Sequence, residues 1–225
     1  MTHTYHKEDR LFFDIETRAL PEACALMPEP KAPANFKDPD KIAAAVAEKK
    51  AEQIASAALD ADYGQIVSIG YAIGSADELD SLPVEVILNT GQPGETEEWL
   101  IAAFWELLAQ CEGRCVGYNI LNFDLPYILR RSFALWVKPL VFPNMARFRT
   151  EPVTDLMAIL YNWGNDRYKG LKTVARLYGI PNDCPDVDGS QVDTLSADEL
   201  IKYQTSDVRL VMRLYARMNG IYFSH

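Results

Sequence analysis

Asp14 and Glu16 form an acidic pair directly behind the apolar run Leu11–Phe13. Because side chains on a β-strand alternate between its two faces, both carboxylates point to the same side. Two like charges in one place favour a cation between them, and hard oxygen ligands favour Mg²⁺ or Mn²⁺. Two such ions acting on a phosphodiester are a common chemistry for this arrangement, and a solvent-facing charged pair at a strand end is the alternative.

A third carboxylate, Asp124, follows a short apolar strand at 115–118 and lies at the start of a predicted helix. Pro126 is typical of a first helical turn, and Asn122 is predicted to cap it. The free backbone N–H groups of a first turn favour an anion, so we expect Asp124 to be ionised. The alternative is an acid that serves only to cap the helix.

A fourth carboxylate lies on the last predicted helix, which opens with Ser196 and Glu199 at capping-box spacing. At about 100° per residue, Tyr203 and Asp207 fall on the apolar stripe of this helix. An Asp on a buried stripe is costly without a partner or a metal ion, and a Tyr one turn earlier can direct its hydroxyl to the same place. The alternative is an Asp bonded to a buried backbone group, with Tyr203 in the core.

These segments resemble, in order and spacing, the three motifs of the DEDD superfamily of 3′-to-5′ exonucleases. Asp14-Ile-Glu16 resembles the first motif, Asn119-x3-Phe123-Asp124 resembles the second, and Tyr203-x3-Asp207 resembles the third. Another branch of the superfamily carries a histidine in the third motif, but the histidines of this chain lie only at positions 3, 6 and 225. The third motif is therefore of the tyrosine type, the branch that includes the proofreading domains of family B DNA polymerases. The resemblance covers nearly the whole chain and is strongest to stand-alone proteins related to those domains.

The resemblance implies a role for each residue. Asp14 would bridge two Mg²⁺ or Mn²⁺ ions, and Glu16 and Asp207 would complete the ion on the nucleophile side. Asp124 would hold the second ion, and Tyr203 would orient the attacking water. The implied activity is hydrolysis of single-stranded or frayed DNA from the 3′ end, with release of nucleoside 5′-monophosphates.

Asp155 is a fifth candidate acid, and we do not count it among the metal ligands. It either orients the site from behind or serves as a structural Asp at the end of the last predicted strand.

The charge distribution indicates where a nucleic acid would bind. The chain carries a net charge of −10, yet residues 130–176 hold nine Lys or Arg against three Asp or Glu. Aromatic residues in the same segment could stack on unpaired bases beside these cations. Expected substrate contacts are Asn119 and Phe123 from the second motif and Lys169 and Lys172 from the basic segment. The expected partner is a single-stranded nucleic acid, with DNA preferred to RNA only through the resemblance, since no residue can be assigned to sensing a 2′-OH.

Length and composition predict a single catalytic domain over residues 1–225, with 48% hydrophobic residues and no segment of membrane-spanning length. The N-terminus lacks the apolar core of a signal peptide, and the four cysteines show no CxxC spacing. We therefore expect a cytoplasmic protein with reduced thiols, no zinc site and no membrane partner. A proofreading role would need a separate polymerase or repair partner.

The elements that must position these residues alternate between strand and helix. Strands are expected at 11–15, 65–72, 84–89, 115–118 and near 153, and helices at 96–109, after 124, from 169 and from 196. This order predicts an α/β protein with a ribonuclease H-like fold, a mixed five-stranded sheet flanked by helices. A Pro- and Ala-rich helical insertion at about 20–63, with a helix starting at Asp38 and Pro39, would be a lid or a partner surface.

Other functions are compatible with this fold: a non-catalytic single-strand-binding module, an RNA-trimming exoribonuclease and an endonuclease. The presence of all four acids and the tyrosine argues against the non-catalytic module. The Tyr-x3-Asp spacing favours an exonuclease over an endonuclease.

Overall fold

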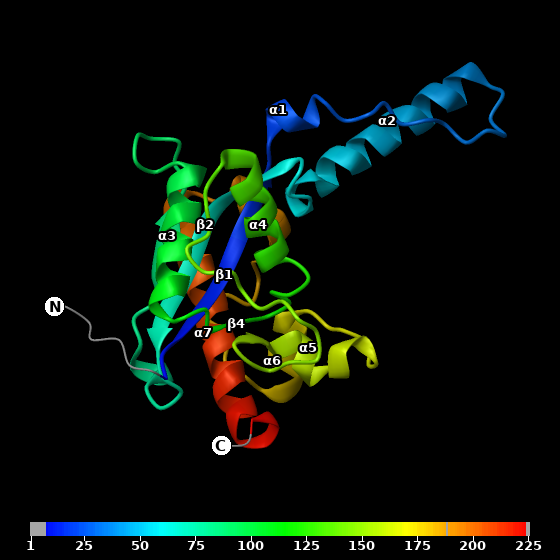
Figure 1. Cartoon of the computed structure of the whole chain (residues 1–225). Coiled ribbons are helices and arrows are strands. Elements are labelled where there is room, and N and C mark those ends of the chain that lie inside the picture. Colours follow the sequence, from blue (N-terminus) through cyan, green and yellow to red (C-terminus); the bar gives the residue numbers. More distant parts are fainter. Residues whose placement is uncertain (1–7, 188, 224–225) are drawn as a thin grey trace. The chain divides into compact units, whose positions relative to one another are not determined.

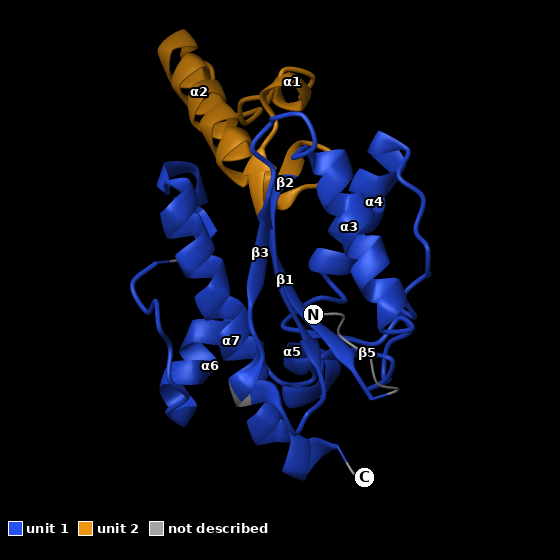
Figure 2. Ribbon diagram, turned by 90° about the vertical axis from the view of Figure 1, so that its left-hand side faces the viewer, with its two compact units in different colours: residues 1–16, 66–225 blue, residues 17–65 orange. Residues whose placement is uncertain are grey.

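The computed structural model describes residues 8–187 and 189–223, and the chain divides into two compact units (Figure 2). Unit 1 comprises residues 1–16 and 66–225, and unit 2 comprises residues 17–65. Unit 2 overlaps the insertion that the sequence predicts at 20–63. That both units belong to one domain stays a prediction.

Unit 2 is mainly helical, with α1 at Pro21–Cys24, α2 at Pro39–Ser56 and a 3-10 turn, η1, at Ala57–Leu59. The Asp38 carboxylate accepts a hydrogen bond from the Asp40 N–H at 3.0 Å, which confirms the predicted start of α2. None of the α2 residues is buried, and the helix is rich in Ala, Lys and Glu. Intrinsic helix propensity therefore contributes more to α2 than packing does.

The sheet is mixed and five-stranded, with the order β3-β2-β1-β4-β5 (Figure 1). β1, β4 and β5 are parallel, with Leu11 opposite Cys115 and Gly117 opposite Asp155, whereas β2 and β3 are antiparallel. The predicted mixed sheet is confirmed. The strands span Arg10–Ala19 (β1), Gly64–Gly74 (β2), Glu85–Leu88 (β3), Cys115–Gly117 (β4) and Val153–Asp155 (β5).

Helices cover both faces of the sheet: α3 and α4 lie on one side, and α6 and α7 on the other (Figure 2). α3 packs against α4, and α7 packs against β3, β4, α5 and α6. The helices span Glu97–Gln110 (α3), Asp124–Leu135 (α4), Leu156–Leu160 (α5), Leu171–Tyr178 (α6) and Ala197–Tyr222 (α7), with 3-10 turns at Leu79–Ser81 (η2), Asn162–Gly164 (η3) and Gly189–Thr194 (η4). Across residues 8–187 and 189–223, no helix has both the length and the apolar character needed to cross a membrane.

β1 is the central strand, and aromatic packing shows which helix covers each of its faces. The Phe12 ring lies 5.3 Å from that of Tyr215 on α7, and the Phe13 ring lies 5.0 Å from that of Phe104 on α3. All four residues are buried. Because neighbouring side chains on a strand point to opposite faces, the even-numbered residues of this part of β1 face α7.

The starts of two helices test the predicted caps. Ser196 and Glu199 form the predicted capping box at the start of α7. The predicted Asn122 cap of α4 is wrong, because Phe123 is the capping residue and makes no side-chain cap bond. Asn122 instead donates its side-chain amide to Asn119 Oδ1 at 3.1 Å, so it stabilises the loop before the helix.

Candidate active site

Three of the predicted acids converge at one place. Asp14 and Glu16 lie on the face of β1 that α7 covers, and Asp207 reaches the same point from α7. One carboxylate oxygen from each of the three lies within 4.8 Å of the others. Of these residues, Asp14 is partly exposed, and Glu16 and Asp207 are buried.

Asp124, in the first turn of α4, lies beside this cluster, and it is not among the three acids whose oxygens lie within 4.8 Å of one another. It is 3% exposed, and its Oδ1 accepts a hydrogen bond from the backbone N–H of Ile15 at 3.2 Å. Ile15 lies between Asp14 and Glu16, so this bond places the fourth acid against the strand that carries the first two. The predicted position of Asp124 in a first helical turn is confirmed.

Asp155 organises the loop that leads to Asp124. Its carboxylate accepts backbone N–H bonds from Asn119 and Leu121 at 3.0 Å each, and from Met157 and Ala158 at 3.0 and 3.1 Å. The same carboxylate therefore caps α5, a helix that the sequence did not predict, and fixes the loop between β4 and α4. Asp155 is fully engaged by backbone donors, which supports the structural alternative.

Tyr203 lies one turn before Asp207 on α7 and is 4% exposed. Burial raises the pKa values of Glu16 and Asp207, and a hydrogen bond from the Tyr203 hydroxyl offsets part of that rise in each. Burial, followed by the negative charge of Glu16, raises the pKa of Tyr203 itself. The phenol therefore stays neutral and can donate a proton in a hydrogen bond.

The carboxylates carry more negative charge than the surrounding residues balance. Burial, reinforced by the charges of Asp207 and Asp124, raises the pKa of Glu16 to about 8. Burial likewise raises the pKa of Asp124 to about 7, and that of Asp14 well above its usual range. A bound cation would reverse these shifts, since it favours the ionised carboxylates.

Lys172, on α6, is a cation beside the cluster. Its Nζ lies 3.9 Å from Asp207 Oδ1 and 4.5 Å from the centre of the Tyr203 ring. It donates a hydrogen bond to the carbonyl of Cys184 at 3.3 Å. One ammonium at this distance lowers the pKa of Asp207 only in part, because burial still raises it overall.

The acid cluster fits a divalent metal ion by two observations. The Oδ1 atom of Asp207 is buried without a hydrogen-bond partner, which is costly for a carboxylate unless another ligand completes it. All four side chains offer hard oxygen ligands, the type that Mg²⁺ and Mn²⁺ prefer. The residues present can therefore hold such ions.

An open cleft of about 370 Å³ lies over the cluster. Besides the acids, its lining includes the predicted contacts Asn119 and Lys169, and Lys172 lines a neighbouring cavity of about 510 Å³. Phe123 packs against Tyr127, with ring centres 5.4 Å apart. The cleft residues are Asp14, Glu16, Tyr118, Asn119, Met157, Tyr168, Lys169, Gly170, Leu171, Tyr203 and Asp207.

Gln204 supports the site, and sequence reasoning did not identify it. It is fully buried, and its Nε2 donates to the backbone carbonyl of Asp14 at 2.8 Å. Gly70 makes room for it, because a Cβ at residue 70 would lie 2.6 Å from Gln204 Cγ. The available signal was a polar residue on the apolar stripe of α7, between Leu200 and Val208.

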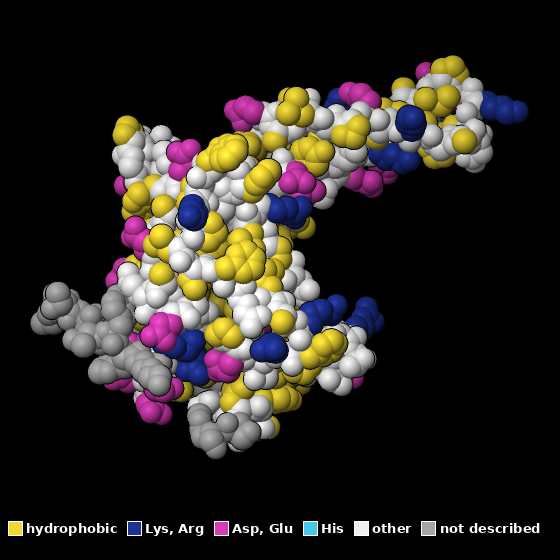
Figure 3. Space-filling view, in the orientation of Figure 1, with side chains coloured by type: hydrophobic (Ala, Val, Ile, Leu, Met, Phe, Trp, Pro, Cys, Tyr) yellow, Lys and Arg dark blue, Asp and Glu magenta, His cyan; other side chains and the backbone are white. Residues whose placement is uncertain are grey.

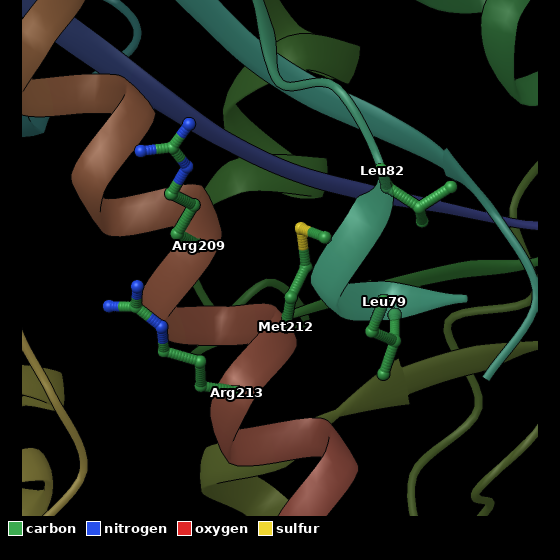
Figure 4. A pocket seen from close by; sticks show the side chains of 5 residues that line it. All are labelled: Leu79, Leu82, Arg209, Met212 and Arg213. Carbon is green, nitrogen blue, oxygen red and sulfur yellow. The ribbon is translucent and has the colours of Figure 1, made fainter. Parts of the chain in front are cut away.

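A separate cavity of about 170 Å³ lies between α7 and η2 (Figure 4). Its lining combines Leu79, Leu82 and Met212 with Arg209 and Arg213. Both guanidinium groups lie near Asp183, at 3.8 Å and 3.2 Å. Asp183 therefore pairs with both arginines, and one carboxylate offsets only one of the two positive charges.

Comparison of the structure with solved structures establishes the class of fold. The chain is similar to a family B DNA polymerase from the hyperthermophilic archaeon Pyrobaculum calidifontis, with a TM-score of 0.59 and 20% identity. The similarity covers 93% of this chain and 24% of the polymerase chain. The fold is ribonuclease H-like, with helices flanking the mixed sheet, as the sequence predicts.

Comparison of the sequence with family models identifies the family. Residues 57–222 match the model of a predicted 3′-5′ exonuclease related to the exonuclease domain of PolB, and the chain belongs to this family. The matched range includes Asp124, Tyr203 and Asp207, and it begins after Asp14 and Glu16. No curated protein sequence matches the chain.

Proposed function

We propose that the protein is a two-metal-dependent 3′-to-5′ exonuclease of the tyrosine type, which shortens single-stranded or frayed DNA and releases nucleoside 5′-monophosphates. The observation that carries this proposal is that Asp14, Glu16 and Asp207 converge beside Tyr203 from β1 and α7, with Asp124 of α4 bonded to the strand that carries the first two. The buried Asp207 Oδ1, which has no hydrogen-bond partner, supports a metal-dependent reaction. The 3′-to-5′ direction follows from the family.

The four carboxylates would hold the ions. By the family resemblance, Asp14 would contribute to both ions, Glu16 and Asp207 would hold the one on the nucleophile side, and Asp124 would hold the second. When bound, the ions would activate a water and stabilise negative charge on the leaving 3′ oxygen.

The protein's own groups would orient the reactants. The neutral Tyr203 hydroxyl, directed toward Glu16 and Asp207, would position the attacking water by a hydrogen bond. Asn119 and Lys169 line the cleft and would bind the terminal nucleotide, the lysine through a phosphate. Lys172 would hold Asp207 in place and reduce its repulsion of the phosphodiester.

The first experiment is the incubation of a 5′-labelled single-stranded DNA oligonucleotide with Mg²⁺ or Mn²⁺. We expect a ladder that shortens from the 3′ end and that disappears with chelator. Asp14→Asn and Asp207→Asn should lower the rate by about a thousandfold or more, because each loses several kcal/mol of transition-state stabilisation. Far-UV circular dichroism should be unchanged in both variants.

The controls separate this proposal from the other candidate functions. Closed circular DNA should remain intact, whereas an endonuclease would open it. An RNA oligonucleotide of the same sequence tests an exoribonuclease. Binding of DNA without cleavage at any metal concentration would overturn the proposal in favour of a non-catalytic module, and near-normal activity of either variant would show that the metal assignment is wrong.

The proposal extends to organisation and location. We propose that both units belong to one exonuclease domain with residues 20–63 as an insertion, and that a separate polymerase or repair protein is the partner in any proofreading role. The four cysteines are free, which supports a reducing, cytoplasmic location.

A further inference from the structure

The four most exposed aromatic side chains among the described residues lie within one short segment. They are Phe133 (82% exposed), Trp136 (91%), Phe142 (73%) and Phe148 (68%), and the next aromatic side chain, Tyr178, is 45% exposed. Large apolar side chains are normally covered, and a concentration of exposed ones indicates a binding surface. Figure 3 shows hydrophobic side chains on the surface over α4.

The same segment is basic and free of acids. Residues 125–150 contain five Lys or Arg and no Asp or Glu, in a chain whose net charge is −10. Arg131 is used inside the fold, where it binds Glu97 at 2.8 Å, and Lys138, Arg147 and Arg149 are exposed. Exposed aromatic rings beside exposed cations fit the bases and phosphates of a single-stranded nucleic acid.

Trp136 is highly exposed and has an unfavourable backbone conformation. Trp136 follows α4 and has φ 58° and ψ 27°, the left-handed conformation in which helices usually place a glycine. Its ring borders an open groove of about 430 Å³ together with Phe133 and Lys138. A strained, exposed tryptophan beside a lysine is poorly explained by the stability of the fold alone.

α4 links this surface to the acid cluster. Asp124 is its first residue and Leu135 its last, so the twelve residues place the groove about 18 Å from the acids along the helix axis. A stacked strand with a 3.4 Å rise covers that length in roughly five nucleotides.

We propose that the aromatic surface, defined as Phe133, Trp136 and Lys138, binds the single strand on the 5′ side of the nucleotide that is removed. The two rings stack on bases, and Lys138 contacts a phosphate. The proposal rests on the function proposed above, because it assigns the surface to the same substrate strand.

The test uses the full chain with single-stranded DNA of two lengths. The variants are Phe133→Ala and Trp136→Gly, and glycine suits the left-handed backbone at residue 136, so this change should not weaken the fold. We expect each variant to bind a twenty-nucleotide strand at least about fivefold more weakly in fluorescence anisotropy. Lys138→Ala should lower the slope of log affinity against log salt by about one.

Strand length separates this proposal from the proposed function. A four-nucleotide strand is too short to reach the aromatic surface, so its metal-dependent cleavage should be the same in wild type and variants. Tyr222→Ala, which removes a half-exposed ring at the end of α7, is the matched control and should bind both strands normally.

Unchanged affinity of Phe133→Ala and Trp136→Gly for the long strand would overturn the proposal even if the short strand is cleaved. A change in sedimentation mass with unchanged DNA affinity would overturn it in favour of a contact between copies of the chain. Failure of the wild type to cleave either strand would instead count against the proposed function. The anisotropy result would still show whether the aromatic surface binds DNA.

Discussion

Two groups of buried charges in this chain differ in how well opposite charges neutralise them. Between α3 and α4, Arg131 donates to Glu97 at 2.8 and 2.9 Å, and the Ile66 N–H donates to the same carboxylate at 2.8 Å. At the start of α4, Asp124 lies beside the cluster of Asp14, Glu16 and Asp207, and Lys172 lies 3.9 Å from Asp207. The first group is complete within the fold, and the second is not.

The difference shows which charges serve the fold and which serve chemistry. A buried charge with geometrically good partners links the elements that carry it, here α3 and α4. A buried group of like charges destabilises the fold until something outside the chain balances it. The acid cluster therefore has the properties of a cation-binding site, and the Glu97–Arg131 pair has those of a structural contact.

The largest expected effect is on the structural pair. Arg131→Ala would leave Glu97 buried without its cation, so the free energy of unfolding should fall by about 3–5 kcal/mol. Urea unfolding in the presence of chelator measures this change. The double variant Glu97→Gln with Arg131→Met keeps an acceptor for the Ile66 N–H and should be much closer to wild type, and a double variant as unstable as the single one would contradict the interpretation.

The next effect concerns Tyr203. In Tyr203→Phe the hydroxyl that orients the water is lost while every carboxylate remains, so kcat should fall about a hundredfold. The stabilisation of the protein by Mn²⁺ should be retained, as measured by thermal unfolding. Tyr215→Phe on the same helix is the matched control, and unchanged turnover in Tyr203→Phe would show that Tyr203 is only part of the core.

A third effect is the pH dependence of the stability of the metal-free protein. The pKa of Glu16 is about 8 and that of Asp124 about 7, above the ordinary values of 4.5 and 3.8. Between these values the folded protein keeps protons that the unfolded chain has released, so stability should fall as pH rises from about 5 to about 8. Thermal unfolding with chelator should show a melting temperature that falls steadily over this range.

Divalent metal should reverse that loss, and most strongly near pH 8, because the ion favours the ionised carboxylates. Glu16→Gln should flatten the pH dependence, since the amide carries no charge at any of these pH values. A metal-free protein that becomes more stable toward pH 8 would show that the cluster is balanced within the fold.

Local patterns were sufficient to predict the main elements. The apolar run before Asp14, the capping box at Ser196 and the stripe that carries Tyr203 and Asp207 each depend on residues close together in the chain. Strand alternation and helix periodicity convert such patterns into directions, so the sequence predicted that Asp14 and Glu16 share one face and that Tyr203 and Asp207 face inward.

Contacts between distant segments were not predictable in this way. Gln204 donates to the backbone of Asp14 and Asp124 accepts from that of Ile15, and each pair is more than 100 residues apart. Arg131 belongs to the basic segment by sequence, yet in the structure it is buried and paired with Glu97.

By itself, the sequence determined the types of residue, their order and the faces of the elements that carry them, because these follow from local backbone geometry. Only the tertiary structure decided which buried charges have partners. Packing brought Arg131 to Glu97 but left Asp207 Oδ1 without a hydrogen bond. Whether a buried charge is compensated depends on distances between segments that are far apart in the chain, and local sequence patterns do not contain these distances.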